Sequence, residues 1–135
     1  MSYSIEKVEG IGPKYAKILR VHNIQTTADI LKHCGDKKSR TKVAKTSGIS
    51  EKLLLEWTNL ADLMRVKGIA EEYADLLEEA GVDTVKELKT RKAESLWEKI
   101  KELNQKKKLT KKTPGKKTVE NWILHAAKLP PTVSH

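Results

Sequence analysis

The feature that most constrains this chain is an internal repeat, in which the sequence matches itself at an offset of 58 residues. Residues 8–19 align without a gap with residues 66–77, and the match continues as residues 22–26 fall on residues 80–84. Each copy of such a repeat is a small unit that buries its apolar face against a neighbour. We therefore expect two copies of one structure, packed as one globule.

The two units are expected over 1–64 and 65–129, followed by a flexible tail over 130–135. After seven extra residues in the second copy, Asn121-Trp122 aligns with Glu56-Trp57. Each unit is therefore predicted to end in a helix that carries a tryptophan.

Composition favours an all-α fold. Apolar residues make up 38% of the chain, Phe is absent, and aliphatic side chains carry most of the hydrophobicity, which suits helices better than a β-sandwich. Apolar residues recur every three or four positions over 53–64 and 93–103, which is typical of buried helical stripes. We predict helices over 13–21, 27–33, 38–46, 51–63, 70–80, 84–89, 92–105 and 116–128.

Several classes of protein are disfavoured by the sequence. No run approaches the roughly 20 apolar residues that span a bilayer, and the first residues lack the apolar stretch of a signal peptide, so we expect a cytoplasmic protein without membrane partners. Cys34 is the single cysteine and has no internal disulfide partner. The four histidines are scattered, so we expect no metal and no cofactor.

The net charge of +9 is concentrated toward the two ends of the chain. Residues 1–63 hold 11 basic and 7 acidic side chains, residues 66–104 hold 7 and 10, and residues 105–135 hold 8 and 1. Residues 105–117 combine Lys, Thr, Pro and Gly and are predicted to form an exposed loop. Clustered lysines suit phosphate binding, and they equally serve solubility.

The segment Val8–Leu19 resembles the helix-hairpin-helix motif of DNA repair, replication and recombination proteins, in the pattern hydrophobe-x-Gly-Ile-Gly-Pro-Lys-x-Ala-x-x-Leu. Both glycines can adopt positive φ and leave the backbone bare, while Ile11 is expected to enter the core and Pro13 to begin the next helix. The resemblance implies that backbone amides there hold a nucleic-acid phosphate without reading bases. The alternative is that the glycines only make a tight interhelical turn. The predicted phosphate cradle is Gly10, Ile11, Gly12 and Lys14, with Lys17 one turn along.

The second copy of this hairpin departs from the pattern. Ala70 replaces the second glycine, and Glu71, Glu72 and Asp75 place negative charge where a phosphate would lie. We expect this hairpin to be a packing element or a surface for a basic partner. Its candidate contacts are Gly68, Ile69 and Ala70.

A third turn lies at Ala44–Ser50 and resembles that of a helix-turn-helix protein, whose second helix reads the major groove. The helix that follows is largely apolar and lacks the Arg, Asn and Gln that discriminate base edges. We therefore interpret Gly48 as a C-cap and Ser50 as an N-cap, in a turn that presents Lys42 and Lys45.

The chain from about residue 5 to 128, including residues 47–53, 62–69 and 80–88, is similar to an uncharacterised prokaryotic family of tandem helix-hairpin-helix proteins catalogued as a domain of unknown function. This resemblance implies a compact multi-helix domain of two tandem helix-hairpin-helix (SAM-like) repeats. It implies no activity, so the functional hypothesis depends on the hairpin and the charge.

The leading hypothesis is a non-enzymatic module that binds DNA largely independently of sequence. Duplex is favoured because Trp57, Trp97 and Trp122 lie on apolar helical faces and offer no stacking platform for single strands. The alternatives are a protein-interaction or self-associating scaffold module, and a glycosylase or lyase, for which no Lys–carboxylate pair stands out. In the leading hypothesis, phosphate contacts come from the first hairpin and from Lys106, Lys107, Lys108, Lys111, Lys112, Lys116 and Lys117.

Overall fold

The computed structural model describes residues 2–135, and within that range the regular structure is entirely helical, which confirms the predicted all-α class. Each predicted helix begins and ends within two residues of the observed bounds. The elements are a short 3-10 helix η1 (Ile5–Lys7) and eight α-helices: α1 (Pro13–Val21), α2 (Thr27–Cys34), α3 (Lys37–Ser47), α4 (Glu51–Leu63), α5 (Glu71–Glu79), α6 (Val85–Leu88), α7 (Ala93–Lys107) and α8 (Lys116–Ala126).

Local hydrogen bonds explain where several helices start and stop. The Thr26 hydroxyl accepts from the Asp29 amide at the start of α2, and the equivalent Thr84 accepts from the Glu87 amide at the start of α6. Gly48 ends α3 in the left-handed region at φ 78°, and the Ser50 hydroxyl accepts from the Leu53 amide to start α4. The interpretation of Gly48 and Ser50 as caps is therefore confirmed.

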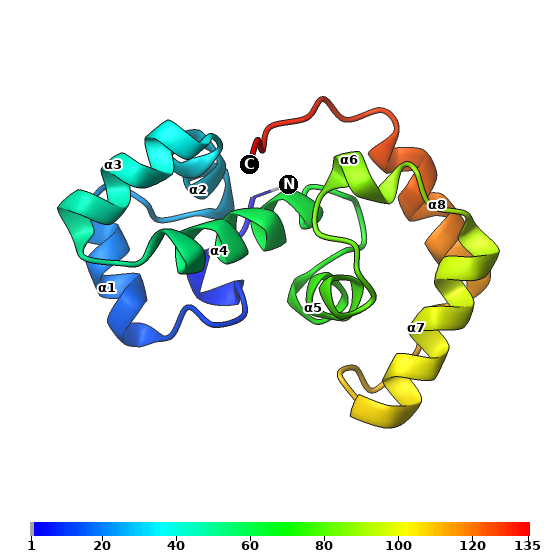
Figure 1. Ribbon diagram of the computed structural model, residues 1–135. Helices are drawn as coiled ribbons and strands as arrows, with labels where there is room; N and C mark the ends of the chain where they lie inside the picture. Colours follow the sequence, from blue (N-terminus) through cyan, green and yellow to red (C-terminus); the bar gives the residue numbers. More distant parts are fainter. Residues whose placement is uncertain (1) are drawn as a thin grey trace.

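The helices gather into two groups, with α1–α4 on one side and α5–α8 on the other (Figure 1). Helix α4 packs against α2, α3 and α5, and it therefore joins the two groups. Their buried apolar side chains belong to one continuous hydrophobic cluster. Most residues of the two predicted stripes are buried. Leu53, Trp97 and Leu103 are only half-buried at the edge of this cluster, and Ala93 is half-buried as well.

The third helix of each unit packs differently. In the first unit α3 contacts α2 and α4, whereas in the second unit the longer α7 contacts α5 and α8. Figure 1 shows α7 running along the outer side of its group. The seven extra residues of the second copy thus accompany a different placement of this helix.

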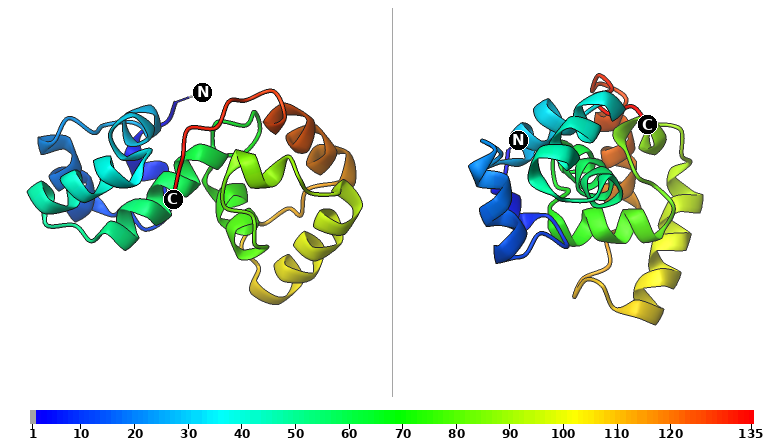
Figure 2. Two further views of the ribbon diagram at one scale, coloured as in Figure 1. Left: turned by 45° about the horizontal axis from the view of Figure 1, so that its top comes forward. Right: turned by 60° about the vertical axis from the view of Figure 1, so that its left-hand side comes forward.

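The C-terminal segment returns across the molecule from α8 toward α2–α4 (Figure 2). Composition predicts flexibility over 130–135, and the structure places several contacts there. The Ser134 amide donates to the Gly35 carbonyl at 2.9 Å, and the Thr132 hydroxyl donates to Asp62 Oδ1 at 3.0 Å. The Arg40 guanidinium is 3% exposed and donates to the carbonyls of Cys34, Gly35 and Ser134. A buried arginine therefore holds this segment against the first unit.

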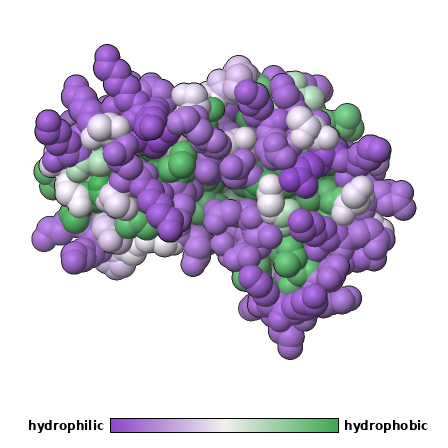
Figure 3. All heavy atoms as spheres, in the orientation of Figure 1, coloured by the Kyte–Doolittle hydropathy of each residue, from purple (hydrophilic) through white to green (hydrophobic). Residues whose placement is uncertain are grey.

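Hydrophilic side chains dominate the face of the molecule seen in Figure 3. Within residues 2–135, no helix combines the length and the apolar character needed to cross a bilayer.

Candidate nucleic-acid interface

The first hairpin turn depends on glycine at position 10. Gly10 has φ 91°, in the left-handed region that side chains disfavour, and the Ile11 amide donates to the Val8 carbonyl at 3.1 Å to close the turn. A Cβ at Gly10 would lie 3.1 Å from Trp57 Nε1. Ile11 is 4% exposed, as predicted for a side chain that enters the core. Backbone conformation and close packing therefore both favour glycine here.

Of the two glycines in this turn, Gly10 uses positive φ and Gly12 does not. Gly12 is the N-cap of α1 with φ −82° and ψ −178°, in the extended region that any residue adopts. The N-cap position accounts for this, because the residue that begins a helix typically has extended backbone, and Ala70 has it as well before Glu71. A Cβ at Gly12 would meet no atom within 4 Å. The turn therefore needs one left-handed glycine rather than two.

The start of α1 presents backbone donors next to positive charge. The Gly12 carbonyl accepts from the Ala16 amide, and no side chain caps the helix. Among the residues that the structure describes, the amides of Gly12, Lys14 and Tyr15 have no protein acceptor, as is usual in a first helical turn. Lys14 and Lys17 are exposed, and neither forms an ion pair with another described residue. Unbonded amides, the helix dipole and two lysines all favour an anion here.

The second hairpin reproduces this backbone. Gly68 has φ 92°, a Cβ there would lie 3.2 Å from Trp122 Nε1, and Ala70 is extended at φ −102°. The Tyr73 and Trp122 rings lie 5.2 Å apart, as Tyr15 and Trp57 lie 5.1 Å apart in the first unit. Ile69 is fully buried.

The charge at the second hairpin is opposite to that at the first. Glu71 and Glu72 occupy the first turn of α5, where α1 has Pro13 and Lys14. Helix α5 packs against α4 and α7, so the hairpin contributes to the packing of the two units.

An acidic seam, formed by Glu9, Glu56, Asp75, Glu78 and Glu79, lies where α5 meets the first unit. Burial and the charges of Asp75, Glu56, Glu79 and Asp83 raise the pKa of Glu78 to about 7, although its side chain remains open to solvent. Burial, followed by the charges of Glu9 and Glu79, also raises the pKa of Asp75. Such a seam opposes phosphate binding at α5.

The predicted basic loop is shorter than residues 105–117. Lys106 and Lys107 belong to the last turn of α7, because this helix continues two residues beyond the predicted end. They pair with Glu102 at 3.2 Å and with Glu79 at 2.7 Å, and Lys117 in α8 pairs with Glu120 at 3.5 Å. The remaining candidates are exposed and have no ion pair among the described residues: Lys108, Lys111, Lys112 and Lys116.

A buried amide holds this loop in shape. Asn104 is 7% exposed, and its Nδ2 donates to the Thr110 carbonyl at 3.2 Å and to Thr113 Oγ1 at 2.8 Å. Its Oδ1 accepts from the Thr110 amide at 3.0 Å. Sequence reasoning missed this residue, although Asn104 lies one helical turn after Ile100 on the predicted apolar stripe, and a polar residue there is the signal. The loop is therefore fixed at its base while its lysines stay exposed.

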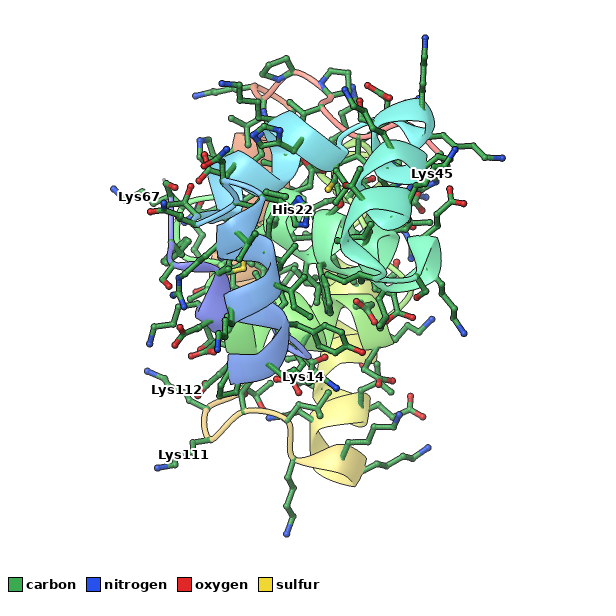
Figure 4. All side chains as sticks on the ribbon, turned by 90° about the vertical axis from the view of Figure 1, so that its left-hand side faces the viewer. Lys14, His22, Lys45, Lys67, Lys111 and Lys112 are labelled. Atoms are coloured by element: carbon green, nitrogen blue, oxygen red, sulfur yellow. The ribbon has the colours of Figure 1, made fainter. Side chains whose placement is uncertain are left out.

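Lys14 of the first hairpin and two lysines of the loop before α8, Lys111 and Lys112, lie toward one end of the molecule but on separate segments (Figure 4). In Figure 4, Lys14, Lys111 and Lys112 lie toward the lower end, whereas Lys45 and Lys67 lie higher on opposite edges. In Figure 1, the turn before α1 and the loop before α8 both lie on the lower side, with α5 between them. The structure thus does not merge the hairpin and the loop into one patch.

Other chemistry has less support in the structure. Burial raises the pKa of the Cys34 thiol to about 11, which disfavours the reactive thiolate. Over residues 2–135, no three His, Cys, Asp or Glu side chains are grouped as a metal site. Trp57 and Trp122 are each 2% exposed, and Lys101 Nζ lies 3.8 Å over the half-buried Trp97 ring. None of these indoles offers an open face for stacking.

Comparison with known proteins gives one match. The model of a family described as a domain of unknown function, DUF4332, matches residues 9–129. No curated protein and no solved structure matches the chain.

Proposed function

The chain belongs to the DUF4332 family, whose description carries no activity, and we propose that it is a non-enzymatic module that binds duplex DNA through the phosphate backbone, largely independently of sequence. The observation that carries this proposal is the start of α1. There, backbone amides that have no acceptor among residues 2–135 lie beside Lys14 and Lys17, as in a helix-hairpin-helix that holds a phosphate.

The loop before α8 supplies the second contact in this proposal. Asn104 holds its base, so Lys108, Lys111 and Lys112 reach a phosphate with less loss of chain entropy than lysines on a mobile loop. The loop and the first hairpin lie on the same side of the molecule, which allows one duplex to contact both (Figure 1). The acidic seam between them limits binding to these two places.

This arrangement sets the expected salt dependence. The two contacts use six lysines that form no ion pair within residues 2–135: Lys14, Lys17, Lys108, Lys111, Lys112 and Lys116. Each neutralised phosphate contributes about −0.9 to the slope of log K against log salt, so the slope should not be steeper than about −5. A continuous basic face would give a steeper slope.

The test is a fluorescence-anisotropy titration with random-sequence duplex and single-stranded DNA over a series of salt concentrations. The variant Gly12→Glu, Lys14→Glu should lose at least about tenfold in duplex affinity, or about 1.4 kcal/mol. Its fold should survive, because Gly12 has extended backbone and open space around it. Circular dichroism checks this point.

Two matched controls belong to the test. Gly12→Ala should bind as the native chain does, because Gly12 has extended backbone with room for a Cβ, and Ala70 shows that alanine keeps this conformation at the equivalent position. Lys45→Glu removes a lysine at a distant edge and should change affinity only slightly (Figure 4). If duplex fails to bind at low salt, or the hairpin variant binds as well as the Lys45 variant, the alternative of a protein-interaction module without a nucleic-acid role gains support.

A further inference from the structure

The second unit carries an open groove between its hairpin turn and α8. The groove has a volume of about 430 Å³. His125 Nδ1 accepts the Lys67 amide at 3.0 Å, so the neutral imidazole carries its proton on Nε2 as a donor. Leu124, one turn from Asn121, is 57% exposed beside it. The groove is lined by Lys67, Gly68, Thr118, Asn121, Trp122 and His125.

The repeat places an equivalent face on the first unit, and there the chain covers it with its own helix. By the alignment, Lys67 corresponds to Glu9, Asn121 to Glu56, and His125 to Leu60. Helix α5 packs on α4. Glu9 and Glu56 both act electrostatically on α5, at Asp75 and at Glu78, and Leu60 is 4% exposed. In the first unit, helix α5 therefore packs against the face that is open in the second unit.

The open face of the second unit has a charge that suits an acidic helix better than the charge of the covered face of the first unit does. In the first unit, Glu9 and Glu56 face the acidic helix α5, which is unfavourable. In the second unit, a lysine and an asparagine occupy these two positions, and His125 adds a donor. A helix with acidic residues spaced as Asp75, Glu78 and Glu79 are would meet complementary charge there.

We propose that the groove beside Lys67 is a docking site for an acidic amphipathic helix of a partner protein, held as α5 is held on the first unit. Helix α5 of a second copy is not available, because it packs between α4 and α7 of its own chain. Helix α1 of a second copy carries Lys14, Lys17 and Arg20, which would repel Lys67. The proposal does not depend on DNA binding, since Lys67 lies away from Lys14 and Lys111 (Figure 4).

The test uses the full chain and a stapled peptide with the sequence of residues 69–81, which contains α5. The staple is needed because isolated helices of this length are marginal in water. Amide chemical shifts of the isotope-labelled protein are followed during titration. Shifts should be confined to residues around Lys67 and to the Thr118–His125 face of α8. Lys67→Glu should weaken binding at least about tenfold, whereas Lys45→Glu should leave it unchanged.

Three results would overturn the proposal. The first is absence of shifts at millimolar peptide. The second is equal binding of a stapled peptide with the same composition in scrambled order, since charge alone would then explain the effect. The third is a dimer of the chain itself, detected by sedimentation and lost in Lys67→Glu, which would assign the groove to a second copy. These three results are independent of the anisotropy test, so a failure of the DNA-binding proposal does not decide the docking proposal.

Discussion

The two hairpin turns share a backbone and differ in charge. Gly10 and Gly68 have φ values of 91° and 92°, and each lies against the Nε1 edge of a buried tryptophan. The residues that follow are Pro13 and Lys14 in one copy and Glu71 and Glu72 in the other. The residues that build the turn are therefore distinct from the residues that set its charge. The charge of one copy can therefore differ while the backbone of the turn is kept.

The comparison extends along the following helix. Glu78 in α5 corresponds to Arg20 in α1. Arg20 Nη2 pairs with Glu6 Oε1 at 2.6 Å, whereas Glu78 lies in the acidic seam. The acidic copy packs between α4 and α7, while α1 keeps its first turn exposed. Inward packing thus accompanies the change of charge.

The largest expected effect comes from breaking the shared backbone. Gly10→Ala and Gly68→Ala should each lower the free energy of unfolding by at least about 1–2 kcal/mol, the cost of left-handed backbone at a non-glycine residue. Crowding against Trp57 and Trp122 adds to it. Urea unfolding followed by tryptophan fluorescence measures this loss. Gly12→Ala is the control and should cost nothing, because that residue is extended. Equal costs at all three glycines would contradict the assignment of distinct roles.

A second experiment makes the two hairpins alike in charge. Changing Ala70, Glu71, Glu72 and Asp75 to Gly, Pro, Lys and Lys copies the first hairpin onto the second. If the first hairpin binds phosphate, duplex affinity should rise about tenfold, or about 1.4 kcal/mol, with a steeper salt dependence. Anisotropy measures both. Ala70→Gly alone is the matched control and should give no gain. A quadruple variant that folds without gaining affinity would show that the hairpin backbone and its lysines are insufficient.

The smallest expected effect tests the acidic seam. The pKa of Glu78 is about 7 in the folded chain, above its ordinary value of 4.5, so the native state binds more protons than the unfolded state between these values. The free energy of unfolding should therefore fall as pH rises from 4.5 to about 7. Because Glu78 remains open to solvent, the change should be no more than about 1 kcal/mol.

Glu78→Gln should remove this part of the pH dependence and stabilise the chain above neutral pH. Chemical denaturation at several pH values measures it. Glu94→Gln, which removes an exposed carboxyl of α7 outside the seam, is the control. An unchanged profile in Glu78→Gln would place the dependence on other groups.

The helices were predictable because their signals are local. The hydroxyls of Thr26 and Thr84 each accept a hydrogen bond from the amide three residues later and so cap the start of a helix. Gly48 is the C-cap of α3. Residue type alone did not decide the conformation of Gly12, because glycine permits both positive and negative φ and its place as the N-cap of α1 selects the extended one. The DNA-binding assignment stays a prediction.

Long-range features of the site lacked such signals. Arg40 is buried in a strongly polar helix, and one of its acceptors belongs to Ser134, which lies 94 residues away. The acidic seam forms because α5 of the second unit lies near Glu9 and Glu56 of the first. The spacing of residues within one repeat does not specify how the two units pack.

The contact between Gly35 and the C-terminal segment has a consequence for folding. It closes a loop from residue 35 to residue 134, about three quarters of the chain, and the entropy of that closure is lost before the contact is gained. Arg40 and Gly35 lie in the first unit and Ser134 beyond the second, so the contact forms only once both units are in place. We expect these bonds to form last and open first, so hydrogen exchange at the Ser134 amide would report on docking of the two halves.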